Sequence, residues 1–111
     1  MHLNSVGEVI AVRTLKLQGE QGTPSDVTVL IGKPQKTPGF DEYYCPYQIR
    51  GAGSEKIGYS CGIDAVQALS LALSILGVEL EVLNKELEGR LSWECDEEGG
   101  FGFPEMPQRA T

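Results

Sequence analysis

The residues closest to a catalytic arrangement are Cys61 and Asp64, three positions apart where a glycine leads into an apolar segment. A thiol near a helix N-terminus can have its pKa lowered by the helix dipole and act as a nucleophile. Here the Asp64 carboxylate opposes that effect, and the single histidine, His2, stands far away in the N-terminal segment. We therefore expect Cys61 to be a small residue on the inward face of a strand, and we assign no catalytic residue.

A ligand site at the same place is the alternative function. Tyr59, Cys61, Asp64, Gln67 and Trp93 supply aromatic, thiol, carboxylate and amide groups that could line a pocket at the start of a helix. The protein would then be a small-ligand-binding protein or an enzyme. This hypothesis requires Asp64 to face the ligand instead of capping the helix.

Metal and acid–base chemistry find little support. Zinc sites need ligands at short, defined spacings, and Cys45, Cys61 and Cys95 have no such spacing. The carboxylates of residues 96–98 lie in a hydrated, glycine-rich turn, whereas a general acid needs a carboxyl group whose pKa is raised in a dry pocket. We expect neither a metal nor another cofactor.

The charge is unevenly distributed along the chain. Residues 1–63 carry six acidic and six basic side chains, whereas residues 64–111 carry ten acidic and three basic ones, which accounts for the whole net charge of −7. An acidic surface repels phosphate backbones, so we expect no nucleic-acid binding. The same surface suits a basic protein partner, although acidic residues also simply keep a small domain soluble.

Cysteine number and the N-terminal residues indicate the compartment. Three cysteines at irregular spacing do not form a disulfide framework. The N-terminus has no basic start followed by an apolar core, so no secretory signal is expected. The longest apolar run, residues 65–78, is too short to cross a bilayer. We therefore expect a cytoplasmic protein that does not enter membranes.

One long helix, from Asp64 to about Glu88, is the clearest element. Asp64 can accept hydrogen bonds from the first-turn amides, and Gln67 can complete a capping box. Leucines spaced by four and three residues keep to one helix face and continue past Gly77, which favours one helix over two. The leucine stripe consists of Leu69, Leu73, Leu76, Leu80, Leu83 and Leu87.

A second apolar stripe lies on another face of this helix. It consists of Leu71, Ile75, Val78 and Val82, spaced by four, three and four residues. One stripe suffices to cover a sheet, so the second needs its own cover. That cover is either the chain itself, through its tail or the curvature of the sheet, or a second copy of the protein in a homodimer.

Five segments have the composition of strands. They are residues 8–17, 26–32, 43–50, 56–61 and 91–94, separated by turns rich in glycine and proline. The first is apolar on both faces, which indicates a central, covered strand. In the fourth, Ile57, Tyr59 and Cys61 are expected to face inward. Phe101 and Phe103 follow the fifth strand as an aromatic latch.

These elements predict a single α+β domain over residues 1–111. Four strands form an antiparallel meander, the helix packs across one face, and the short fifth strand returns beside the first, giving the order 5-1-2-3-4. The ordered core should span about residues 6–104, with residues 105–111 frayed.

Three short motifs give the chain a family resemblance. They are the helix start Gly-Ile-Asp-Ala-Val-Gln-Ala-Leu at residues 62–69, Leu-Ser-Trp at residues 91–93 and Gly-Phe-Pro at residues 102–104. It resembles a family of small bacterial proteins catalogued as a domain of unknown function. The resemblance covers about residues 8–104. It implies a bacterial, cytosolic origin and brings no established activity or catalytic residue.

The sequence therefore predicts a non-enzymatic binding or interaction protein. The second helix stripe would form the interface of a homodimer, and the acidic C-terminal half would meet a basic protein partner. An enzyme is the less favoured class because no catalytic constellation is present.

Overall fold

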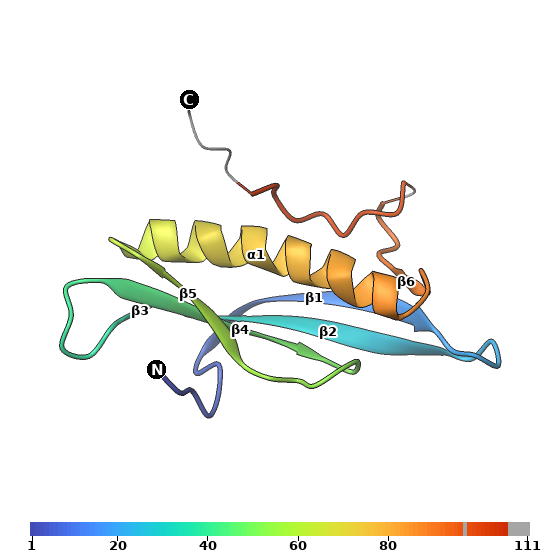
Figure 1. Cartoon of the computed structure of the whole chain (residues 1–111), viewed down its shortest axis with the longest axis horizontal. Coiled ribbons are helices and arrows are strands. Elements are labelled where there is room, and N and C mark those ends of the chain that lie inside the picture. Colours follow the sequence, from blue (N-terminus) through green and yellow to red (C-terminus); the bar gives the residue numbers. More distant parts are fainter. Residues whose placement is uncertain (97, 107–111) are drawn as a thin grey trace.

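The computed structural model describes residues 1–96 and 98–106, and it has one helix lying across one face of an antiparallel sheet (Figure 1). The predicted α+β class is confirmed. The sheet has six strands. These are β1 (Val9–Gln18), β2 (Pro24–Gly32), β3 (Gln35–Lys36), β4 (Tyr43–Arg50), β5 (Gly58–Gly62) and β6 (Leu91–Ser92), and the helix is α1 (Ala65–Glu86).

The strand order differs in detail from the predicted meander. The path runs β3-β4-β2-β1-β6, and β5 also pairs with β4. The difference is β3, which pairs antiparallel with the start of β4 in a segment expected to be loop. Tyr47 of β4 pairs with both Ile31 and Gly58, so β2 and β5 lie on opposite edges of β4. The last strand does pair antiparallel with the first, through Lys16 and Ser92.

Helix α1 is continuous through Gly77, as its leucine pattern predicts. The Asp64 side chain accepts a hydrogen bond from the amide of Gln67 at 2.8 Å, and the Gln67 side chain accepts one from the amide of Ile63 at 2.7 Å. The Asp64 bond satisfies a first-turn amide that has no partner within the helix, and the Gln67 bond satisfies the amide of the residue before the N-cap. At its C-terminal end, Glu88 and Gly89 both adopt positive φ, which stops the helix.

The core lies between α1 and the sheet. On the helix, Ala68, Ala72, Leu76 and Leu80 are fully buried. They pack in one cluster with side chains from one face of the sheet, including Leu15, Val27, Val29, Cys45 and Tyr47. Helix α1 is also long and apolar enough, by length and composition alone, to cross a bilayer, which corrects the estimate made from residues 65–78. Here it serves as the core helix of the domain.

Strand β5 faces the opposite way from the prediction. Ser60 and Gly62 are buried, whereas Cys61 is exposed and Tyr59 is half-buried. The pairing explains this, because Ser60 is opposite the buried Cys45, and Cys61 is opposite Tyr44. The inward positions hold small residues instead of apolar ones, so an apolar pattern could not identify them.

The first strand lies between β2 and β6, as expected, but its first half is not covered. Strand β6 pairs only with residues 16 and 17 of β1. Val9, Ile10 and Val12 are 41%, 46% and 56% exposed. The register with β2 shifts between Val9 and Ala11, which marks a bulge in this half of the strand. The apolar side chains in the first half of β1 therefore border solvent on both faces.

The segment after β6 folds back onto the helix (Figure 1). Phe101 is buried in the core cluster, and Phe103 packs against it from a half-buried position. The Ser74 hydroxyl donates a hydrogen bond to the carbonyl oxygen of Glu105 at 3.2 Å. Both rings of the expected latch therefore pack on their own chain. The fraying predicted for residues 105–111 concerns positions that, from 107 onward, lie outside the described residues.

Candidate functional site: a groove beside the helix

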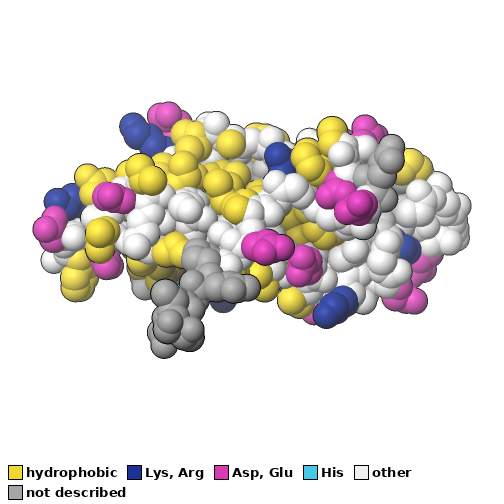
Figure 2. All heavy atoms as spheres, turned by 90° about the horizontal axis from the view of Figure 1, so that it is seen from above, with side chains coloured by type: hydrophobic (Ala, Val, Ile, Leu, Met, Phe, Trp, Pro, Cys, Tyr) yellow, Lys and Arg dark blue, Asp and Glu magenta, His cyan; other side chains and the backbone are white. Residues whose placement is uncertain are grey.

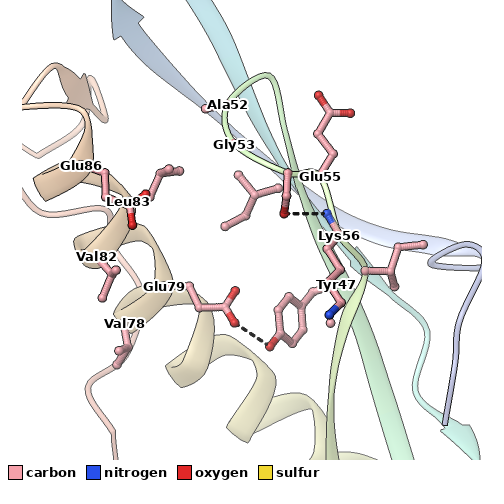
Figure 3. A pocket seen from close by; sticks show the side chains of 14 residues that line it. Tyr47, Ala52, Gly53, Glu55, Lys56, Val78, Glu79, Val82, Leu83 and Glu86 are labelled. Atoms are coloured by element: carbon pink, nitrogen blue, oxygen red, sulfur yellow. Dashed lines mark hydrogen bonds between the residues drawn. The ribbon is translucent and has the colours of Figure 1, made fainter.

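An open groove of about 630 Å³ separates the second half of α1 from the segment joining β4 to β5 (Figure 3). The helix supplies one wall, the connecting segment of residues 51–57 supplies the other, and β4 supplies the floor. The lining residues are Tyr47, Ile49, Ala52, Gly53, Ser54, Glu55, Lys56, Ile57, Gly58, Val78, Glu79, Val82, Leu83 and Glu86.

The groove exists because β5 is shorter than β4. Pairing between them ends at Tyr47 and Gly58, so the rest of β4 has no strand on that edge. Glu55 holds the connecting segment in place. Its carbonyl oxygen accepts a hydrogen bond from the Gln48 side chain at 2.6 Å, and its carboxylate accepts one from the amide of Gly51 at 3.1 Å. The far wall of the groove is therefore fixed to the sheet.

The helix wall is apolar and accessible. Val78 and Val82 are 44% and 52% exposed, and Leu83 beside them is half-buried. Figure 2, which looks onto the helix side, shows hydrophobic side chains gathered along this face with acidic side chains around them. Exposed apolar side chains that adjoin one another in a hollow are typical of binding surfaces.

The polar groups of the groove are mainly acidic. Glu55, Glu79 and Glu86 line it together with one basic residue, Lys56. The hydroxyl of Tyr47 donates a hydrogen bond to the Glu79 carboxylate at 3.1 Å across the inner end of the groove (Figure 3). Burial raises the pKa of Tyr47, and the Glu79 charge raises it further. Tyr47 therefore stays protonated and can donate this hydrogen bond to Glu79.

The chemical groups that line the groove are few in kind. The lining contains neither histidine nor cysteine, and a tyrosine with a raised pKa is a weak proton donor. Among the described residues, no group of three histidine, cysteine, aspartate or glutamate side chains is placed to hold a metal ion. The groove offers an apolar surface and negative charge.

The residues predicted to form a ligand site at the helix start have separate surroundings. The Asp64 carboxylate is occupied by the amide of Gln67. Tyr59 lines a smaller cavity with the N-terminal residues. Partial burial of the Cys61 sulfur raises the pKa of its thiol, and the charge of Glu42 raises it further, so the protonated thiol is favoured.

Trp93 lies far from the other four. It follows β6, at the opposite end of α1 from Asp64 (Figure 1). Its ring lies beneath the guanidinium of Arg13, with 4.1 Å from the guanidinium carbon to the ring centroid. The structure thus brings Tyr59, Cys61, Asp64 and Gln67 to the end of the molecule where α1 begins, and places Trp93 elsewhere.

The second helix stripe divides into two halves. Val78 and Val82 line the groove, whereas Leu71 and Ile75 are half-buried. The tail packs elsewhere on the helix, because a side chain at Gly77 would meet the Cβ of Phe103 at 3.1 Å. The tail segment described here therefore leaves Val78 and Val82 exposed.

Sequence reasoning did not identify the rest of the groove. Tyr47 and Ile49 were expected as ordinary inward residues of a strand, and residues 51–57 as a turn followed by strand. A local sequence pattern does not predict the distance between the segment of residues 51–57 and the helix. The available signal for the groove was the second helix stripe, in which Val78 and Val82 are spaced by four residues.

Comparison with known proteins gives the family. The model of a family described as "Domain of unknown function (DUF6968)" matches residues 11–105. No curated protein matches the chain significantly, and no solved structure does. Because the match covers most of the chain, the protein belongs to the DUF6968 family of domains of unknown function.

Proposed function

We propose that this chain is a non-enzymatic interaction protein that binds a basic protein partner in the groove beside α1. The observation that carries the proposal is the pair of half-exposed valines, Val78 and Val82, in an open groove lined by three carboxylates and one lysine. Apolar contact would supply affinity, and the carboxylates would select a cationic partner and speed its approach.

The acidic lining favours a different protein over a second copy. In a symmetric dimer through this groove, the same patch meets itself. Glu79 and Glu86 would then lie close to the same two residues of the other copy, and like charges in an interface cost free energy. A basic partner meets no such repulsion. The homodimer is therefore an outcome that the experiment must detect.

Site-specific photo-crosslinking tests the proposal. A benzophenone amino acid placed at Val82 is compared with one at Val12, an apolar residue of β1 with nearly the same exposure, 56% against 52%. In the native cells, we expect an adduct with a basic protein from position 82 only. The purified partner should bind the wild type and lose at least tenfold in affinity with Val82→Asp, but less than twofold with Val12→Asp.

Three results would overturn the proposal. These are equal adducts from positions 82 and 12, an adduct whose partner is acidic, or a partner that binds Val82→Asp and wild type equally. A self-adduct of the purified protein at position 82, with a dimer mass in light scattering that Val82→Asp reduces to that of a monomer, would replace the basic partner by a homodimer.

A further inference from the structure

We infer that the part of the partner received by this groove is an amphipathic helix with basic residues beside its apolar stripe. This inference rests on the proposed function and specifies its recognition element. The structure carries it through three features: the spacing of the apolar side chains along α1, the shortness of the open strand edge in the groove, and the position of the carboxylates.

The apolar side chains lie in a line that suits a second helix. Val78 and Val82 are exposed in the groove, one helical turn apart, and Leu71 and Ile75 continue their line from half-buried positions outside it. The spacing of four, three and four residues is that of the contact seam between two packed helices. The line is about 16 Å long at ~1.5 Å per residue. Helix α1 is held by its buried face against the sheet, so the seam is preformed, and little conformational entropy is lost when a partner helix docks.

A docking strand fits the groove less well. Strand addition needs a row of free backbone amides and carbonyls along a sheet edge. Beyond its pairing with β5, β4 has only residues 48–50 on this edge, and the Gln48 side chain is turned to Glu55 there. The walls are made mainly of side chains, namely Val78 and Val82 on α1 and Ala52 and Ile57 opposite. Such walls contact the apolar face of a helix.

The carboxylates define the charge of the helix. Glu79 and Glu86 are seven residues apart, two helical turns, and both border the groove beside the seam. On the other side of the seam, Glu81 and Lys85 have opposite charges that cancel. A partner helix would therefore carry lysine or arginine on one flank, at a spacing of about two turns, to lie against Glu79 and Glu86.

Three labelled synthetic peptides test this inference by fluorescence anisotropy. The first consists of leucine and lysine in a heptad pattern that forms an amphipathic helix. The second has the same composition in scrambled order, and the third replaces every lysine by glutamate. We expect the helical basic peptide to bind at least tenfold more tightly than the scrambled one, and the acidic peptide not to bind. Affinity should fall as salt rises.

Matched charge variants locate the binding. The double variant Glu79→Gln with Glu86→Gln should lower the affinity for the helical basic peptide at least fivefold. Glu8→Gln with Glu20→Gln removes the same charge from exposed positions before and after β1, outside the groove, and should weaken peptide binding less than twofold. Circular dichroism confirms that each variant is folded.

The outcomes separate the inference from the function beneath it. If the scrambled peptide binds as well as the helical one, or if both charge pairs have equal effects, the helix inference is wrong. The groove would still be the site if photo-crosslinking at Val82 finds a basic partner. If that crosslinking also fails, the proposed function is wrong as well.

Discussion

Two of the three cysteines, Cys45 and Cys61, have surroundings that favour the protonated thiol. Cys45 is buried on β4, and its thiol donates a hydrogen bond to the carbonyl oxygen of Gly32 at a sulfur–oxygen distance of 3.4 Å. Burial raises the pKa of Cys45 from 9.0 to about 11. The pKa of Cys61 is also raised, first by burial. Both thiols therefore stay protonated at neutral pH, where a nucleophile would need to be a thiolate.

The raised pKa of Cys45 predicts a loss of stability at alkaline pH. Below pH 9 the thiol is protonated in both the folded and the unfolded protein. Between pH 9 and about 11 the unfolded chain ionises while the folded one does not, so folding becomes less favourable. Two pH units correspond to about 2 to 3 kcal/mol.

Urea unfolding of wild type and Cys45→Ala from pH 8 to 11 measures this effect. We expect the stability advantage of the wild type to shrink by about 2 to 3 kcal/mol over that range. Tyrosine ionisation affects both proteins alike and cancels in the difference. A constant difference across the range would show that burial of Cys45 does not control its ionisation.

At the scale of elements, the packing of β5 against α1 depends on small residues. A Cβ atom at Gly62 would lie 2.5 Å from the backbone nitrogen of Ala68, and one at Gly58 would lie 2.7 Å from the Tyr47 ring. The helix can approach the strand only because Gly62 lacks a side chain, and the Tyr47 ring of β4 can lie beside β5 only because Gly58 lacks one. That approach places α1 and thereby sets the width of the groove, whose floor and helix wall meet at Tyr47 and Glu79.

The variant Gly62→Ala tests this close approach. The added methyl group meets helix backbone, which cannot move aside as a flexible side chain can, so we expect a loss of about 1 to 3 kcal/mol. Cys61→Ala is the matched control, because Cys61 is the exposed neighbour on the same strand. It should change stability by less than about 0.5 kcal/mol in the same urea titration. Equal stability of the two variants would mean that β5 does not constrain the helix.

At the scale of the whole molecule, Arg13 joins the first strand to the C-terminal segment. Its guanidinium lies over the Trp93 ring and 4.9 Å from the centre of the Phe103 ring. One of its nitrogens donates a hydrogen bond to the carbonyl oxygen of Phe101 at 2.9 Å. Gly102 lets the chain pass close by, since its φ is +76° and a Cβ there would lie 2.2 Å from Trp93. These contacts hold the tail against the domain.

Replacement of Arg13 by methionine should loosen the tail. Arg13→Met keeps an unbranched apolar stem and removes the charge and the hydrogen bond to Phe101, which are worth about 1 to 3 kcal/mol together. We expect faster hydrogen exchange in residues 101–105 and a red shift of Trp93 fluorescence. Arg50→Met is the control, because the Arg50 guanidinium donates to the side chain of Gln48, on β4. Unchanged exchange in residues 101–105 would mean that Arg13 does not anchor the tail, and that Phe101, Phe103 and the Ser74–Glu105 hydrogen bond suffice.

The sequence by itself determined the local elements with strong periodic signals. Asp64 and Gln67 indicated where the helix begins, and the leucine spacing indicated that it continues past Gly77. Alternating apolar residues indicated β2. These signals concern residues near in sequence, whose spacing fixes which helix or strand face they share. The same reasoning failed for β5, where Gly58, Ser60 and Gly62 face inward without an apolar pattern.

Only the tertiary structure decided which apolar residues stay exposed. The length of β6, two residues, leaves Val9 and Val12 of β1 near solvent. The end of β5 pairing at Gly58 leaves Val78 and Val82 facing a groove. The exposure of these valines depends on where β5 and β6 end. The ends of those strands are set by packing between elements and not by the valines themselves. This is why the second stripe was visible in the sequence, whereas the groove it lines was not.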